Sequence, residues 1–236
     1  LLLVICGCTP KPTEVVSPDG HIRLQFALDD HNRMTYRIDV DDTAFVTPSA
    51  LGFLAGKGVN LSEGMKVVGT EFSAADETWT QPWGENKSIR NHYNEMAVCL
   101  SDEADTKLTL RFRVFDDGVG FRYEYEVAGV DSIFVTDELT SFNMAQDGIS
   151  WSIPANYETY ELLYRTQPLS KTDNANTPMT FKVGKTYASI HEAALTDFPE
   201  MTLQNTGGCG FKSELAPWPD GIKAKIEGGS FNTPWR

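Results

Sequence analysis

The sequence predicts an all-β fold, a sandwich or a barrel, and three observations lead to this class. Short alternations of apolar and polar side chains recur along most of the 236 residues, as expected for strands with one buried face. Turn signals separate these alternations at intervals of about 8–12 residues, which is typical of sandwiches and barrels. No long segment carries the i, i+3, i+4 apolar stripe of an amphipathic helix.

The first predicted hairpin lies near the N-terminus. Residues 21–28 and 36–40 both alternate, and the polar residues 29–32 between them form a turn. Later strands are expected at residues 96–100, 132–135, 151–153, 180–183, 187–192 and 221–226.

A second hairpin has the clearest signal in the chain. Residues 108–114 and 119–127 alternate strictly and flank Asp117-Gly118, and both of these residues tolerate the positive φ of a tight turn. Residues 51–61 contain too many glycines for a stable helix. Because no linker follows residue 18, we expect a single domain over residues 17–236.

Composition limits the classes of ligand. Hydrophobic residues make up 41% and charged residues 22%, as in ordinary globular proteins. The formal net charge of -13 argues against a nucleic-acid partner, since phosphates recruit Lys and Arg. An acidic domain is compatible with a neutral sugar or with a cation, and an acidic surface that serves solubility alone is the alternative.

The first 16 residues read as a targeting segment with a tether. Residues 1–5 resemble the end of a signal-peptide apolar core, and Ile5-Cys6-Gly7-Cys8 resembles a bacterial lipobox with Cys8 as the acylated residue. We therefore expect an exported protein, in the periplasm or anchored as an outer-membrane lipoprotein; a cleaved signal peptide is the alternative. The chain has no initiator Met and reads as a piece of a longer protein.

The two remaining cysteines lie far apart in the sequence. Cys99 and Cys209 could pair in an oxidising compartment, but independent thiols are the favoured interpretation.

One carboxylate has an unusual position. In residues 187–195, alternation places Glu192 on the face of Ala188 and Ile190, and His191 on the opposite face. A carboxylate on an apolar face is costly unless a metal, a cation or hydrogen bonds compensate it. Glu192 is therefore expected to meet such a partner.

Aromatic and polar side chains concentrate in segments that read as loops, which are residues 76–85, residues 89–95, and Trp151 with residues 157–161. Trp79 and Trp83 lie there among carboxylates and amides, the combination that holds sugars, because an indole packs on C–H faces while polar groups bind hydroxyls. The alternative is that the two tryptophans cover an open end of the sandwich.

Taken together, these blocks resemble the N-terminal domain of glycoside hydrolase family 97. In chain order they are SPDG at 17–20, DETW at 76–79, PWGE at 82–85, RNHYNE at 90–95, FRVFDDGVGFRYE at 112–124, HEAAL at 191–195 and PWR at 234–236. The family comprises bacterial exo-acting enzymes, mostly α-glucosidases and α-galactosidases.

The resemblance implies a large β-sandwich of the galactose-mutarotase-like kind, followed by a (β/α)8 catalytic barrel that this sequence does not contain. It also implies a calcium ion ligated mainly by barrel carboxylates, with Glu192 as the one ligand from this domain. His191 beside it could contact substrate or be purely structural.

The resemblance places no catalytic residue on this sequence, because family catalysis uses barrel carboxylates. The preference of tight turns for Asp is sufficient to explain Asp116 and Asp117. We therefore expect a non-catalytic, carbohydrate-binding-type domain of an exported hydrolase of α-glycosidic bonds, inactive by itself. A stand-alone sugar-binding module, with Trp79 and Trp83 as its platform, is the alternative. Glucosidase or galactosidase activity, and inversion or retention, stay open.

Overall fold

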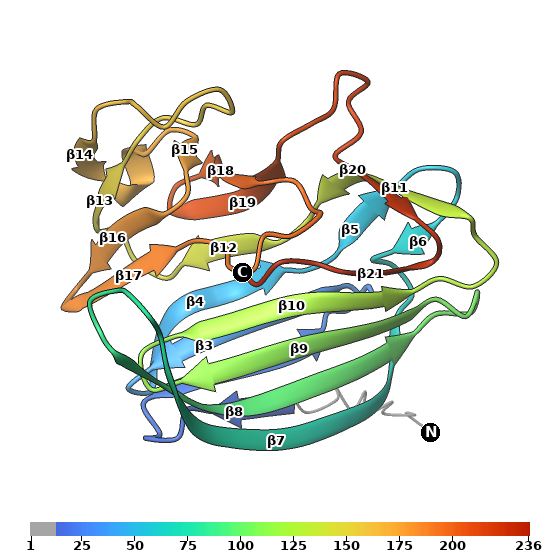
Figure 1. The fold of residues 1–236 in the computed structure, drawn as a ribbon, viewed down its shortest axis with the longest axis horizontal. Helices are drawn as coiled ribbons and strands as arrows, with labels where there is room; N and C mark the ends of the chain where they lie inside the picture. The colour runs from blue at the N-terminus through green and yellow to red at the C-terminus, as the bar shows by residue number, and fades with distance from the viewer. Residues whose placement is uncertain (1–12) are drawn as a thin grey trace, which may run out of the picture.

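The computed structural model describes residues 13–236, which form four antiparallel sheets (Figure 1). The largest sheet has eight strands. In spatial order they are β1 (Thr13–Val16), β2 (Ile22–Leu28), β3 (Met34–Val40), β4 (Thr43–Ala50), β12 (Ser141–Met144), β19 (Gly210–Leu215), β18 (Met201–Gly207) and β15 (Ala175–Asn176).

The second sheet has five strands and carries the longest hairpin. Its order is β21 (Ser230–Asn232), β10 (Val119–Glu126), β9 (Lys107–Phe115), β8 (Ser88–Ser101) and β7 (Lys66–Thr80).

Two smaller sheets of four strands each complete the fold. One contains β20 (Ala224–Glu227), β11 (Ser132–Glu138), β5 (Phe53–Ala55) and β6 (Asn60–Leu61). The other contains β14 (Arg165–Pro168), β13 (Ile149–Ser152), β16 (Met179–Val183) and β17 (Thr186–Ile190), with a 3-10 turn at Leu169–Lys171.

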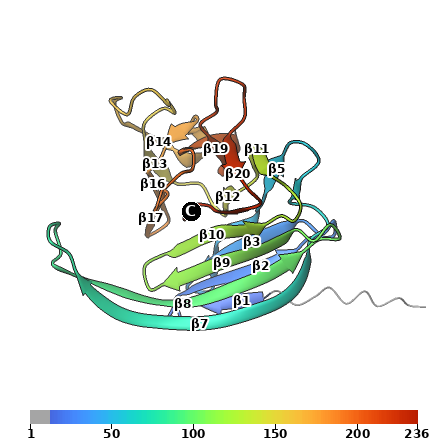
Figure 2. The same cartoon turned by 45° about the vertical axis from the view of Figure 1, so that its right-hand side comes forward.

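The hydrophobic core lies between the eight-stranded and the five-stranded sheets, which face each other (Figure 2). Phe26 of β2 meets Phe112 of β9 with ring centroids 6.2 Å apart, and Tyr36 of β3 meets Phe121 of β10 at 5.1 Å. Phe53 of β5 joins the same cluster through Tyr123, at 4.9 Å. Face-to-face packing of two sheets confirms the predicted all-β class.

The predicted hairpins exist with nearly the expected limits. β2 pairs with β3, and β9 pairs with β10 around a connection of residues 116–118. The face predicted to be buried in β9 is buried: Leu108, Leu110, Phe112 and Val114 are all at most 1% exposed.

The prediction of loops at residues 76–85 and 89–95 is wrong. Most of these residues belong to the β7–β8 hairpin, whose pairing runs from Lys66↔Ser101 to Thr80↔Ser88, so that only residues 81–87 form a loop. Both faces of β7 are largely exposed. A strand with two exposed faces has no apolar alternation, so the periodicity of the sequence could not reveal it.

Two boundaries also differ from expectation. Residues 13–16, which we expected in the tether, form β1 and pair with β2, so the folded part begins before residue 17. The strand expected at residues 187–192 ends at Ile190. The signal-peptide and lipobox predictions, including Cys8, fall outside the described residues. Within residues 13–236, no helix is long and apolar enough to cross a bilayer.

Candidate functional site

Glu192 lies just beyond the end of β17, where the chain leaves the small sheet. The strand alternation continues for two residues, so that Ile190 is buried, His191 is exposed and the Glu192 side chain is only 10% exposed. The next residue, Ala193, forms a β-bridge with Trp235. The carboxylate therefore points inward, as the sequence predicted from alternation.

Two donors hold the Glu192 carboxylate in place. Its Oε1 accepts the backbone N–H of Met201 at 2.9 Å, and its Oε2 accepts Nη1–H of Arg236 at 2.9 Å. Hydrogen bonds and an arginine thus provide part of the compensation that the position of this carboxylate requires. Each oxygen receives one protein donor and keeps a further lone pair.

Arg236 connects Glu192 to a second, deeper carboxylate. Its Nε donates to Oε1 of Glu138 at 3.1 Å, and its Nη2 donates to Oε2 of Glu138 at 2.8 Å. Both side chains of this ion pair are fully buried. The three groups Glu138, Arg236 and Glu192 are called the Glu–Arg–Glu triad below.

The C-terminal segment brings Arg236 into the triad. β21 pairs with β10, and the backbone of Arg236 exchanges hydrogen bonds with Phe121 at 2.8 and 3.0 Å. Trp235 pairs with Ala193 in the same way, and its indole lies beneath the guanidinium groups of Arg113 at 4.6 Å and Arg122 at 4.9 Å. These contacts order the segment that ends at Arg236.

The charge of the triad is unbalanced. By formal charge, two carboxylates and one guanidinium leave one negative charge, and the negative charge of Glu200 also acts on Glu192. Burial raises the pKa of Glu192, and Glu138 and Glu200 raise it further, against the opposing effects of the Met201 N–H and Arg236. Nearby, Tyr160 donates to Glu200 at 2.7 Å, and burial together with this carboxylate raises the pKa of Tyr160 to about 12. A cation would relieve this excess of negative charge.

Among residues 13–236, no group of three or more His, Cys, Asp or Glu side chains is arranged to hold a metal ion by itself. Glu192 nevertheless fits the part of a single oxygen ligand. It is oriented by two hydrogen bonds, keeps free lone pairs, is slightly exposed and belongs to a cluster with excess negative charge. A full set of charged ligands for such an ion would need side chains from outside residues 13–236.

His191 points away from the triad. It is exposed, and its Nδ1 lies 3.2 Å from the backbone oxygen of Glu192, to which it donates in the corresponding tautomer. It makes no hydrogen bond to the Glu192 carboxylate within the described part of the chain. His191 is therefore free to meet a ligand or a partner.

Trp79 and Trp83 lie on the projecting end of the β7–β8 hairpin, here called the arm and comprising residues 76–92. β8 pairs with β9 only as far as Tyr93, so the arm has two strands alone. Trp79 is 51% exposed and Trp83 is 83% exposed. In both views the arm lies apart from the C-terminus (Figures 1 and 2), so the structure does not bring these two residues together with Glu192.

Cross-strand polar contacts order the arm. Arg90 binds Asp76 through two hydrogen bonds of 2.7 and 2.8 Å, and Asn91 donates to Glu77 at 2.8 Å. The tryptophans are thus displayed on a defined hairpin.

Asp116 and Asp117 lie in the turn between β9 and β10. Asp116 accepts the backbone N–H of Asp19 at 3.0 Å and lies 3.4 Å from Nδ1 of His92. The contact with Asp19 ties the turn to the β1–β2 connection of the eight-stranded sheet, and His92 lies in β8 of the same sheet as the turn.

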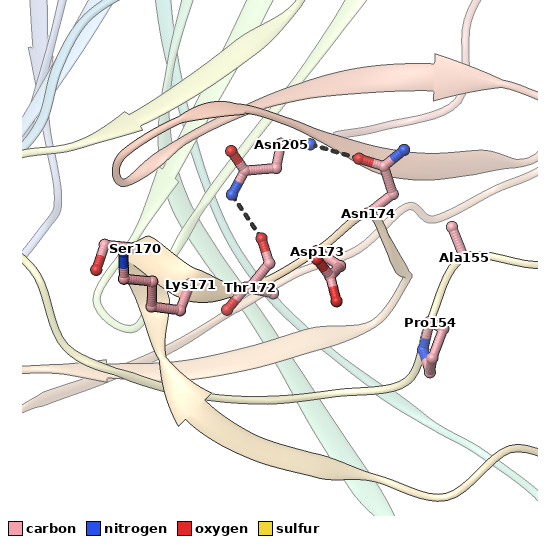
Figure 3. Close-up of a pocket in the computed structure, with 8 residues that line it drawn as sticks. All are labelled: Pro154, Ala155, Ser170, Lys171, Thr172, Asp173, Asn174 and Asn205. Carbon is pink, nitrogen blue, oxygen red and sulfur yellow. Dashed lines mark hydrogen bonds between the residues drawn. The ribbon is translucent and has the colours of Figure 1, made fainter.

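Two surface pockets were not anticipated from the sequence. One, of about 560 Å³, is polar and is shown in Figure 3; it is lined by Pro154, Ala155, Ser170, Lys171, Thr172, Asp173, Asn174 and Asn205. Asn205 organises it by donating from Nδ2 to the Thr172 carbonyl at 2.6 Å and from its backbone N–H to the Asn174 side chain at 3.0 Å.

The second pocket, of about 540 Å³, contains Phe198 and Trp218 together with Pro199, Pro217 and Pro219. The run Pro217-Trp218-Pro219-Asp220-Gly221 was the signal that could have drawn attention to it. Neither pocket is lined by Trp79, Trp83, His191 or Glu192.

Comparison with known proteins decides the family. The model of the glycosyl hydrolase 97 N-terminal domain matches residues 15–236. The chain belongs to this family. A family 97 enzyme from Pseudoalteromonas sp. strain K8, solved in complex with panose and with acarbose, is 35% identical with a TM-score of 0.88, over 95% of this chain and 35% of that one.

Curated relatives of this family 97 domain are more distant. A retaining α-galactosidase from Bacteroides thetaiotaomicron is 26% identical over 97% of this chain and 36% of its own length. A probable retaining α-galactosidase from Streptomyces bingchenggensis is 24% identical over 86% of this chain and 31% of its own length. The chain therefore spans about a third of the length of the relatives that it matches.

Sequence reasoning about this family 97 domain missed Glu138 and Arg236 as site residues. Arg236 belongs to the closing Pro-Trp-Arg block that carried part of the resemblance. Nothing local, however, marks Glu138 as its partner, since the two are 98 residues apart.

Proposed function

We propose that this chain is the N-terminal, non-catalytic region of a longer exported glycoside hydrolase that cleaves α-glycosidic bonds. The match to the family over residues 15–236, together with the coverage of about a third of each relative, supports this proposal. In this view the catalytic carboxylates belong to the part of the enzyme that lies outside this chain, and the turn residues Asp116 and Asp117 are structural.

We also propose that Glu192 supplies one ligand to a calcium ion shared with the catalytic region. The observation that carries this proposal is the oriented, slightly exposed Glu192 carboxylate in a cluster of net negative charge. Calcium prefers oxygen ligands and tolerates variable geometry, so a site built from two regions is chemically reasonable. The ion would supply positive charge that orients and polarises an oxygen of the substrate.

The proposed substrate is an oligosaccharide of the kind that the Pseudoalteromonas enzyme binds, as the panose and acarbose complexes suggest. Within this chain, His191 near the metal ligand and Trp79 and Trp83 on the arm are the proposed sugar contacts. Glu192 would be held ready by Met201 and Arg236, without needing to reorient when substrate arrives.

The test is Glu192→Gln in the complete enzyme. The calcium dissociation constant measured by calorimetry should rise by about tenfold or more, because an amide oxygen carries no net charge, and hydrolysis of aryl α-glycosides should fall with it. Glu126→Gln, at an exposed position of β10, is the control and should change neither quantity. Unaltered calcium affinity in Glu192→Gln would refute the assignment.

A stand-alone carbohydrate-binding module is the second candidate, and the 83% exposure of Trp83 favours it. Calorimetry of this chain with maltose and with galactosides separates the two candidates. Binding that is lost in Trp83→Ala but kept in Glu192→Ala supports the module. Absence of binding by the chain alone supports the role within a longer enzyme.

Export through a lipid anchor at Cys8 is part of the proposal. Labelling of cells with a radioactive fatty acid should mark the protein, and Cys8→Ser should abolish the label. A labelled Cys8→Ser protein would contradict acylation at this residue.

A further inference from the structure

We propose that Glu138, although fully buried, sets how strongly Glu192 attracts a calcium ion, because it neutralises the arginine that lies between them. This inference rests on the proposed function of Glu192. It concerns a positioning residue, since Glu138 does not reach the ion and is hydrogen-bonded to Glu192 only by way of Arg236.

Arg236 shares its donors unequally between the two carboxylates. Glu138 accepts two of them, from Nε and Nη2, in the fork geometry that makes arginine–carboxylate pairs strong. Glu192 accepts only one, from Nη1. The guanidinium charge is therefore paired mainly with the deeper carboxylate.

The three groups of the triad lie at different depths below the surface. The Glu138 and Arg236 side chains have no exposed surface, whereas the Glu192 side chain keeps 10%. Charges in a dry interior are poorly screened, so an unpaired guanidinium at this position would be felt strongly at Glu192. Only Glu192, at the outer end of the triad, can reach an ion.

An ion that approaches Glu192 meets the net charge of the whole triad. By formal charge the triad carries one negative charge, and because Arg236 is paired mainly with Glu138, this charge resides at the outer end. If Glu138 were neutral, Arg236 and Glu192 would cancel each other, and a divalent cation would approach a guanidinium with no other partner. The hydrogen bonds that orient Glu192 would remain, but the attraction for the ion would fall.

The experiment measures calcium binding by calorimetry, and the calcium-induced rise in Tm, for variants of the complete enzyme. Glu138→Gln should weaken calcium binding by about tenfold or more, because the lost charge lies in a poorly screened interior. The double variant Glu138→Gln with Arg236→Gln restores the net charge of the triad but removes one of the two donors that hold Glu192, so its calcium affinity should lie between that of Glu138→Gln and that of the unmodified enzyme. Glu138→Asp keeps the charge, and its calcium affinity should stay within about threefold of that of the unmodified enzyme.

Glu95→Gln is the matched control. Glu95 is a well-buried carboxylate with two arginine partners, Arg111 and Arg113, on the five-stranded sheet, and its loss should leave calcium binding unchanged. Calcium affinity of Glu138→Gln equal to that of the unmodified enzyme would overturn the proposal, as would a double variant as weak as the single one.

If Glu138→Gln does not fold, calcium binding by the double variant and by Glu138→Asp tests the proposal instead. A calcium affinity more than about tenfold below that of the unmodified enzyme in either variant would overturn the proposal. If Glu192→Gln binds calcium normally, the proposed function itself fails. If Glu192→Gln weakens binding while Glu138→Gln does not, only the present inference fails.

Discussion

At the scale of single residues, alternation predicted which way side chains point but not what they meet. Glu192 faces inward and His191 faces outward, as the period of a strand requires. The partner of Glu192, however, is Arg236, 44 residues further along the chain. Such a pairing exists only after the C-terminal segment has folded back against β10.

Tyr123 gives a test of a buried polar contact. Its hydroxyl accepts the Gly52 N–H at 3.1 Å and shares a hydrogen bond with Thr140 at 2.7 Å, in a side chain with no exposed surface. Tyr123→Phe leaves both partners unsatisfied and should lower the free energy of unfolding by about 1–3 kcal/mol. Urea denaturation measures this value. Tyr187→Phe, at an exposed position, should have no measurable effect, and equal losses in the two variants would contradict the argument.

The Asp29 carboxyl is expected to make the free energy of unfolding depend on pH. Although burial opposes it, hydrogen bonds from the Arg33 side chain and from the backbone of Arg33 and His31 lower the pKa of Asp29 from 3.8 to about 2. A carboxyl whose pKa is lower in the folded state stabilises the fold above its unfolded pKa. This contribution is therefore complete above pH 3.8 and is lost as the pH falls through about 2.

Asp29→Ala should accordingly cost about 1 kcal/mol at pH 7, and the difference from the unmodified chain should shrink towards pH 2. Urea denaturation at a series of pH values measures the trend, with Asp30→Ala at the adjacent exposed position as the control. A cost that does not change with pH would argue against ionisation as its origin.

At the scale of elements, strands with one buried face were predictable and strands with two exposed faces were not. β9 and β10 carry the strict alternation that the core demands, and they were predicted nearly to the residue. The arm carries no such pattern, because cross-strand pairs such as Arg90 with Asp76 order it instead of a core.

Removal of the arm tests this difference. Replacing residues 77–91 by Asn-Gly joins the paired residues Asp76 and His92 through a tight turn. The exposed arm adds little to the core, and its surface ion pair is worth at most about 1 kcal/mol, so we expect the free energy of unfolding to change by no more than about that amount. Calorimetric binding of maltose, if the intact chain shows it, should disappear with Trp79 and Trp83. A loss of more than about 3 kcal/mol would indicate that the arm is part of the folding core.

At the scale of the whole molecule, the C-terminal segment closes the structure. It adds β21 to the five-stranded sheet, bridges Ala193 and delivers Arg236 to a carboxylate in the interior. One segment therefore connects β10, the end of β11 and the chain that follows β17.

Deletion of residues 230–236 should be strongly destabilising. Glu138 would be left buried without its partner, and breaking a buried ion pair costs about 3–5 kcal/mol. Urea denaturation of the truncated chain measures the loss. Arg236→Gln removes the ion pair but keeps β21, so this variant measures the contribution of the ion pair by itself. A truncated chain whose free energy of unfolding lies within about 1 kcal/mol of that of the full chain would contradict the role assigned to this segment.

The sequence alone determined the all-β class, the main hairpins, the inward direction of Glu192 and the family resemblance, because all of these depend on local periodicity and on residues in fixed order. The tertiary structure alone decided that the aromatic segment is an arm, that Phe198 and Trp218 share a pocket, and that Glu138, Arg236 and Glu192 form one triad. These features depend on contacts between residues far apart in the chain. Hydrophobic periodicity and secondary-structure propensity are local properties, so they do not show which distant side chains a folded sheet brings within hydrogen-bonding distance.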